Sequence, residues 1–200
     1  MTMNLPNILT LSRLIISPVF MALLLVDNVY SRLGALALFI LASITDLLDG
    51  YLARKNGQQT DFGKFMDPVA DKFLIALALI SFVALKSAST WMVMVIIGRE
   101  FLIMGLRTLV AYRREVMESS FLAKIKTFSQ MTAVFAILLH ICLNDCVDAG
   151  LISISWQFLA DLKFSFDALL FLAMLLTLLS GVDYVIKNRW LILGLFKDNM

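Results

Sequence analysis

The chain has 200 residues, of which 60% are hydrophobic and only 16% are charged, and its formal net charge is +2. A soluble domain is about a quarter charged, so this composition excludes an ordinary soluble protein and indicates that lipid covers part of the surface. The small net charge gives no reason to expect a nucleic-acid partner. We therefore predict an all-α membrane protein in which residues 1–200 form a single transmembrane domain.

The N-terminal segment, residues 1–14, is amphipathic and contains Arg13. A cleaved signal peptide would have an uninterrupted apolar stretch followed by small residues at the cleavage site, and this segment has neither. It instead predicts a short interfacial helix that runs into the first membrane span.

Six apolar segments approach or exceed the length of about 20 residues that a membrane-spanning helix needs. They cover approximately residues 9–26, 33–53, 65–85, 91–111, 127–143 and 166–186. The longest polar connections between them are residues 112–126 and 144–165.

The basic residues predict how these spans are oriented. With six spans, both termini share one side with the second and fourth connections. That side would carry Arg54, Lys55, Lys64, Arg113, Arg114, Lys124, Lys126, Lys187, Arg189 and Lys197. The opposite side would carry only Arg32, Lys86 and Lys163. Because Lys and Arg accumulate on the cytoplasmic side, both termini are predicted to be cytoplasmic.

Four aspartates flank the connection between the second and third spans. Asp46 and Asp49 are three residues apart near the end of one predicted helix, and Asp67 and Asp71 are four apart near the start of the next. These spacings place each pair on one helix face. Four facing carboxylates would repel one another strongly unless cations lay between them. Their all-oxygen ligation favours two Mg²⁺ or Mn²⁺ ions over zinc.

The residues between the two pairs suit a phosphate-bearing ligand. Gly50 and Gly63 leave room for a bulky group or a close backbone approach, and the short side chain of Ala53 adds to this room. Arg54 can donate two hydrogen bonds to a phosphate. The simpler interpretation, ordinary charges at helix ends, accounts poorly for two pairs at helical spacing with these small residues between them.

The full pattern, D-x₂-D-G-x₂-A-R-x₈-G-x₃-D-x₃-D over residues 46–71, resembles the signature of the CDP-alcohol phosphatidyltransferase family at every fixed position. The resemblance implies a homodimer of six-span subunits in a bacterial cytoplasmic (inner) membrane, with CDP-diacylglycerol as donor. It implies that the four aspartates hold two divalent ions and that Asp71 is the general base. It also implies a cytidine and diphosphate site lined by Asp49, Gly50, Ala53, Arg54 and Gly63. The acceptor hydroxyl would then displace CMP directly, at the cytoplasmic face.

Three further segments are similar to the phosphatidylglycerophosphate synthase branch of this family, for which the acceptor is glycerol 3-phosphate. They are residues 5–13, 98–107 and 124–130. One departure is Ala123, which stands where that branch usually has glycine. We predict that Lys124, Lys126 and Arg107 contact the acceptor phosphate, although lysines at this place also fit the positive-inside pattern alone.

Other polar residues leave alternatives open. Asn7, Thr10 and Arg13 would either contact the nucleotide or anchor the interface. Arg99 and Glu100 lie deeper in their span, where an unpaired charge is expensive, so either an internal charge network or substrate contact is expected.

Three residues are expected to have no catalytic or metal-binding role: the two cysteines are expected to pack, and His140 to pack or to lie as a polar residue at the interface. His140 lies far from the aspartates in this topology, and Cys142 and Cys146 lack the partner cluster that a zinc site would need.

Two classes of rival function remain at this point. Within the family, the acceptor could be phosphatidylglycerol (giving cardiolipin), serine or inositol phosphate. Outside it, a divalent-metal transporter would also place aspartates in membrane spans. A transporter is expected to carry them near the middle of the membrane, whereas these four lie at the ends of two spans.

Overall fold

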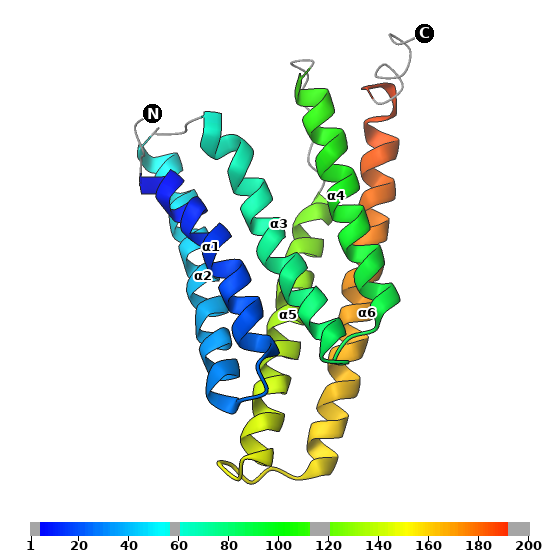
Figure 1. The fold of residues 1–200 in the computed structure, drawn as a ribbon. Coiled ribbons are helices and arrows are strands. Elements are labelled where there is room, and N and C mark those ends of the chain that lie inside the picture. Colours follow the sequence, from blue (N-terminus) through cyan, green and yellow to red (C-terminus); the bar gives the residue numbers. More distant parts are fainter. Residues whose placement is uncertain (1–4, 57–60, 113–120, 192–200) are drawn as a thin grey trace. The chain divides into compact units, whose positions relative to one another are not determined.

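The computed structural model describes the backbone of residues 5–56, 61–112 and 121–191, and the side chains of residues 10–45, 66, 69–70, 72–110 and 122–191. Within these ranges the chain forms six α-helices and no strand (Figure 1). They are α1 (Leu5–Leu25), α2 (Val29–Asn56), α3 (Asp61–Ala84), α4 (Thr90–Tyr112), α5 (Phe121–Asp148) and α6 (Trp156–Lys187). The all-α class is confirmed, and each predicted span corresponds to one helix.

Some helix boundaries differ from the prediction. Helix α1 is continuous from Leu5, so the predicted interfacial helix is not a separate element. Pro6 does not interrupt it, because a proline in the first turn has no intrahelical hydrogen bond to lose. Helices α5 and α6 both extend into the predicted connection 144–165. Polar pairs four residues apart support these extensions, such as Asn144 Nδ2 with His140 Nε2 at 2.9 Å.

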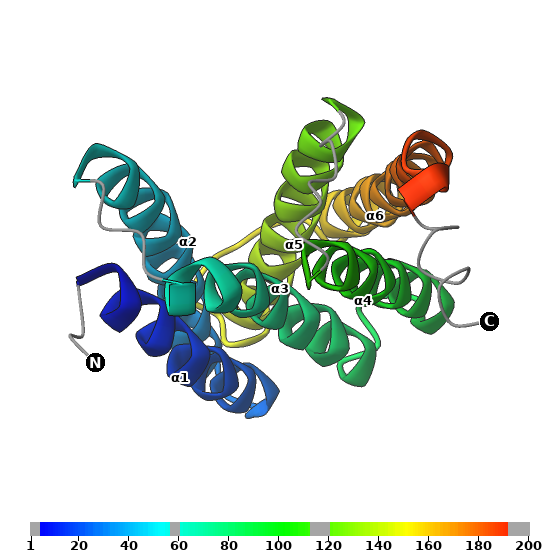
Figure 2. The ribbon, with the colours of Figure 1, turned by 90° about the horizontal axis from the view of Figure 1, so that it is seen from above.

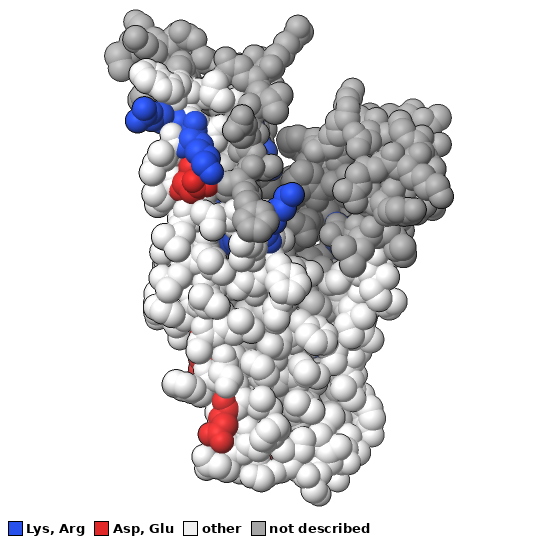
Figure 3. Space-filling model, turned by 180° about the vertical axis from the view of Figure 1, so that it is seen from behind, with Lys and Arg blue, Asp and Glu red and all other residues white. Residues whose placement is uncertain are grey.

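The surface of the helices is largely apolar, as expected for a membrane protein. By length and composition, the stretches Leu122–Asp148 and Trp156–Lys187 are able to cross a bilayer, and α1, α2 and α3 contain shorter apolar stretches. Large side chains are exposed along them, for example Phe164 at 79%. Most of the described surface in Figure 3 carries neither acidic nor basic groups.

The helices are grouped into two compact units. The first comprises Met1–Ser87 and Ala136–Leu162, and therefore contains α1, α2, α3, the second half of α5 and the start of α6. In this unit α1 packs against both α2 and α3 (Figures 1 and 2). Its core includes Phe20 of α1 and Phe39 of α2, whose ring centroids are 5.8 Å apart.

Local hydrogen bonds determine where several of these helices begin and end. Asn28 caps α2, because its Oδ1 accepts a hydrogen bond from Tyr30 N at 2.8 Å. Lys86 adopts a left-handed backbone conformation with φ 56° after α3. Its N–H donates to Val83 O, and Ser87 N–H donates to Phe82 O, which is the Schellman arrangement.

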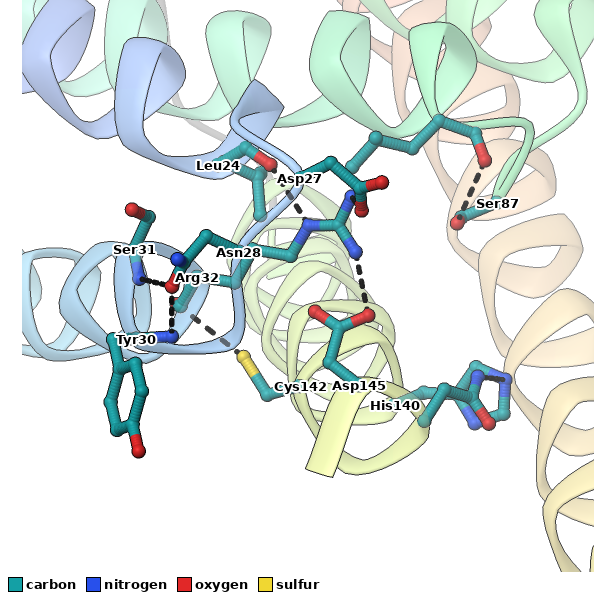
Figure 4. Close-up of polar contacts among 12 residues, drawn as sticks. Leu24, Asp27, Asn28, Tyr30, Ser31, Arg32, Ser87, His140, Cys142 and Asp145 are labelled. Carbon is teal, nitrogen blue, oxygen red and sulfur yellow. Dashed lines mark hydrogen bonds and ion pairs between the residues drawn. The ribbon is translucent and has the colours of Figure 1, made fainter. Parts of the chain in front are cut away.

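One arginine joins three segments of the first unit at the end of α1 (Figure 4). Arg32 Nη1 donates to Asp145 Oδ1 of α5 at 2.6 Å, Nη2 lies 3.2 Å from Asp27 Oδ1, and Nε donates to Leu24 O at 3.3 Å. The Arg32 and Asp145 side chains are only 12% and 16% exposed, whereas Asp27 is 98% exposed. Arg32 therefore holds α5 against α1 and α2 mainly through Asp145.

We predict that Asp145→Ala lowers the free energy of unfolding by about 1–3 kcal/mol, because it leaves a mostly buried guanidinium without its main partner. The measurement is thermal unfolding of the purified protein in detergent. Asp27→Ala is the matched control, since it removes an exposed contact to the same guanidinium and should hardly change the unfolding temperature. Equal shifts for the two variants would contradict this account.

The second unit comprises Ala88–Phe135 and Lys163–Met200, so its described part contains α4, the first half of α5 and most of α6. Helices α4 and α6 meet through Trp91 and Phe171, whose rings are in edge contact with centroids 6.3 Å apart. Arg99 of α4 lies across Gly181 of α6. This unit contains the basic residues that were predicted to contact the acceptor.

Candidate active site

The first unit carries the aspartates on two consecutive helices, α2 and α3, each of which packs against α1. Asp46 and Asp49 lie in the second half of α2, and Asp67 and Asp71 lie in the first half of α3. The end of α2 and the start of α3 lie at the same end of the unit as the start of α1 (Figure 1). The side chains of the four aspartates lie outside the described residues, so their predicted approach to one another stays a prediction.

The described part of α2 indicates which face carries its aspartates. Ala35, Phe39 and Ala42 are buried, at 0%, 2% and 0% exposure, and are spaced by four and then three residues. The same spacing reaches positions 46 and 49, and the backbone of α2 stays helical to Asn56. Both aspartates therefore occupy register positions on the face that packs into the unit.

On α3 the aspartates come before the buried apolar residues in the chain, whereas on α2 they come after them. Leu74, Ala78 and Phe82 are buried, and stepping back by three and four residues from Leu74 gives positions 71 and 67. The aspartates of α3 therefore also occupy positions on its packed face. Carboxylates of the four aspartates would offer only oxygen ligands, which is the chemistry that Mg²⁺ and Mn²⁺ prefer.

Helix α1 contributes polar residues at the same end of this unit. Its buried stripe changes from polar to apolar along the helix, in the order Thr10, Arg13, Ser17, Phe20, Leu24. Thr10 and Arg13 are each only 1% exposed. A residue that anchors the helix among lipid headgroups would be exposed, so the burial favours a role inside the unit. Asn7 lies one turn earlier, and its side chain is outside the described residues.

Gly50, Ala53 and Arg54 follow Asp49 within α2, and Gly63 lies near the start of α3. Their backbone is helical, and the contacts that were predicted for them with a nucleotide concern atoms outside the described residues. Of the described side chains, no cluster of three or more His, Cys, Asp or Glu is able to hold a metal ion. The aspartates of α2 and α3 thus remain the candidate metal ligands.

The predicted acceptor residues all lie in the second unit, but in different environments. Arg107 is an exposed residue of α4 that is held by Tyr184 of α6, with Nε 3.4 Å from Oη and Cζ 5.7 Å from the ring centroid. Lys124 is exposed on α5, whereas Lys126 is only 2% exposed. Two residues apart on a helix, these lysines do not share a face.

Arg99 and Glu100 belong to an internal charge network, one of the two alternatives that the sequence left open. Lys126 Nζ donates to Glu100 Oε1, and the same oxygen lies 3.2 Å from Arg99 Nη1. Arg99 Nη2 also donates to Ser180 Oγ at 3.0 Å. The contributions of α6 were missed because an ordinary serine, glycine or tyrosine in an apolar helix gives no sequence signal. The roles of these residues become visible only because the structure places them opposite charged residues of α4.

The three residues expected to have no catalytic or metal-binding role all lie in the first unit. His140 is buried and hydrogen-bonded to Asn144. Cys142 is a buried free thiol whose Sγ lies 3.5 Å from Arg32 O, and Cys146 is also free. His140 and Cys142 therefore lie in the interior of the first unit, and Cys146 is partly exposed.

Comparison with known proteins identifies close relatives over nearly the whole chain. Residues 3–192 match the CDP-alcohol phosphatidyltransferase family. CDP-diacylglycerol–glycerol-3-phosphate 3-phosphatidyltransferase of Bacillus subtilis (strain 168) is 43% identical over 92% of this chain and 95% of its own length. The Escherichia coli (strain K12) protein of the same name is 34% identical over 94% and 97%. The probable phosphatidylglycerophosphate synthase of Mycobacterium tuberculosis (strain ATCC 25618 / H37Rv) is 37% identical over 92% and 81%.

Proposed function

Because the chain belongs to the CDP-alcohol phosphatidyltransferase family, we propose that it transfers the phosphatidyl group of CDP-diacylglycerol to glycerol 3-phosphate. The products are phosphatidylglycerophosphate and CMP. The observation that carries this proposal is the motif over residues 46–71, set on the ends of two helices, in a chain 43% identical to an enzyme with that name. The protein is therefore a phosphotransferase of phospholipid biosynthesis.

The aspartates divide the chemistry between them. Asp46, Asp49, Asp67 and Asp71 would hold two divalent ions, Mg²⁺ or Mn²⁺, which would neutralise the diphosphate of the donor and the charge that develops on the departing CMP. Asp71 accepts the proton of the acceptor hydroxyl as that oxygen attacks the phosphorus that bears the lipid. The P–O bond to CMP breaks as the new bond forms, so no covalent enzyme intermediate is needed.

Two groups of residues bind the donor in this proposal. Asp49, Gly50, Ala53, Arg54 and Gly63 line the cytidine and diphosphate site. Asn7, Thr10 and Arg13 close it from α1, which is supported by the burial of Thr10 and Arg13 and by the packing of α1 against α2 and α3.

The acceptor phosphate is bound by Lys124, Lys126 and Arg107. A phosphate with two negative charges needs more than one cation, and these three lie at the connected ends of α4 and α5. Arg107 is held in place by Tyr184, which reduces the side-chain entropy lost on binding.

All six helices cross the bacterial cytoplasmic membrane in this proposal, with both termini and the active site on the cytoplasmic side, and the enzyme is a homodimer. The excess of basic residues on one side supports the orientation. A cytoplasmic site at the membrane surface gives a soluble acceptor and a lipid donor access to the same aspartates.

An acceptor panel tests this function. The purified protein is given CDP-diacylglycerol and Mg²⁺ with glycerol 3-phosphate, serine, inositol phosphate or phosphatidylglycerol, and CMP release is measured. We expect release with glycerol 3-phosphate well above that with the others. Release with a different acceptor alone would contradict the choice of glycerol 3-phosphate but keep the family chemistry. No release with any acceptor would contradict the proposed enzyme activity itself.

A further inference from the structure

We propose that Glu100 is a positioning residue that places the Lys126 ammonium for the acceptor phosphate, and that Arg99 and Gly181 hold Glu100 in turn. This role rests on the proposed function, in which Lys126 contacts that phosphate. Neither Glu100, Arg99 nor Gly181 belongs to the aspartate motif, and none is assigned substrate contact.

Lys126 and Glu100 form a buried ion pair, which is the first observation that supports this proposal. The Lys126 and Glu100 side chains are 3% and 7% exposed, and Lys126 Nζ donates to Glu100 Oε1. Taking an ion pair out of water costs more than its Coulombic attraction commonly returns, so such a pair is weak evidence of a stabilising role. Lysines that only fix membrane orientation have no reason to be buried, whereas Lys126 is only 2% exposed.

The shared oxygen supplies the second part of the inference. Two cations, Arg99 and Lys126, meet one carboxylate oxygen of Glu100. Because Arg99 contacts the same oxygen that accepts the Lys126 hydrogen bond, its position helps to determine where the Lys126 ammonium lies.

Helix α6 fixes the far end of this network. Arg99 borders a groove whose walls include the apolar residues Leu102 and Val182, so its polar contacts determine where the guanidinium lies. It donates to Ser180 Oγ at 3.0 Å and lies across Gly181. A Cβ at position 181 would lie 3.1 Å from Arg99 Nε and 3.3 Å from its Cγ. Glycine at 181 therefore gives Arg99 the space from which it reaches Glu100.

A double-mutant cycle separates positioning from general stability. Glu100→Gln should raise the KM for glycerol 3-phosphate about tenfold, the loss expected for one charge-assisted hydrogen bond, with a much smaller effect on the KM for CDP-diacylglycerol. In a Lys126→Gln background the same substitution should have almost no further effect on that KM, because the residue it positions is gone. The double variant should unfold at a higher temperature than Glu100→Gln alone, since it also removes the buried ammonium that has lost the Glu100 carboxylate.

Two glycine variants keep the test informative if Glu100→Gln does not fold. Gly181→Ala should raise the KM for glycerol 3-phosphate about threefold, because Arg99 must shift by a few tenths of an ångström. Gly98→Ala is the matched control: it also replaces a helical glycine, directly before Arg99, but its added Cβ meets nothing within 4 Å. It should leave both KM values unchanged.

The outcomes distinguish this role from the function on which it rests. Wild-type protein that is inactive with glycerol 3-phosphate would overturn the proposed acceptor, and the role of Glu100 with it. Active wild-type protein with additive effects of Glu100→Gln and Lys126→Gln, or with equal effects of Gly181→Ala and Gly98→Ala, would overturn only the positioning role.

Discussion

Asp71→Asn should reduce turnover by a factor of about 10³ or more, because it removes the general base and weakens a metal ligand at once. An amide has nearly the same shape as a carboxylate but neither accepts the proton at neutral pH nor supplies the negative charge. The measurement is the initial rate of CMP release with saturating CDP-diacylglycerol and glycerol 3-phosphate. Binding of the donor should stay detectable, since the nucleotide contacts are assigned to other residues.

The control for this substitution is Asp27→Asn. Asp27 is a carboxylate of the same unit that is 98% exposed and lies after the opposite end of α1. It should have wild-type turnover. Full activity in Asp71→Asn would remove Asp71 as the base, and loss of donor binding together with turnover would assign it to the nucleotide site.

Removal of divalent metal is the second change with a large expected effect. Excess chelator should abolish CMP release, because the four aspartates would repel one another and the donor diphosphate and departing CMP would lack their counter-charge. Addition of Mg²⁺ or Mn²⁺ should restore activity. Asp67→Asn should shift the Mg²⁺ concentration for half-maximal activity upward, because the site loses one charged oxygen ligand.

Undiminished activity in chelator would contradict the two-ion proposal. The test also separates the aspartates from the basic residues of the second unit. Lys126→Gln should change the KM for the acceptor but leave the Mg²⁺ dependence as in the wild type. If Asp67→Asn and Lys126→Gln both shifted the Mg²⁺ dependence, the division of roles between metal and acceptor residues would be wrong.

Local sequence features predicted the helices and the order of the motif well. The lengths of the apolar segments predicted the six helices. Helical periodicity alone predicted that aspartates three or four residues apart share one helix face. The helix ends were less predictable. Asp145 reads as a loop residue in sequence, yet it lies in the last turn of α5 because Arg32, far away in the chain, pairs with it.

The second unit illustrates what sequence could not supply. The presence of Arg99 and Glu100 within an apolar segment indicated that partners must exist, but their identity depends on tertiary packing. Lys126 had been predicted as a substrate residue on the basis of position, and its burial against Glu100 became visible only in the structure. Gly181 carried no signal at all, because its importance lies in the space it leaves for a side chain of another helix.

The most direct test of the central claim follows the label of the acceptor. Glycerol 3-phosphate labelled with ¹⁴C is incubated with the purified protein, CDP-diacylglycerol and Mg²⁺, and the lipid fraction is then extracted. We predict that label enters the lipid fraction as phosphatidylglycerophosphate, in equal amount to the CMP released and only when CDP-diacylglycerol is present. CMP release without label in the lipid would contradict the account, since the phosphatidyl group would then have gone to another acceptor.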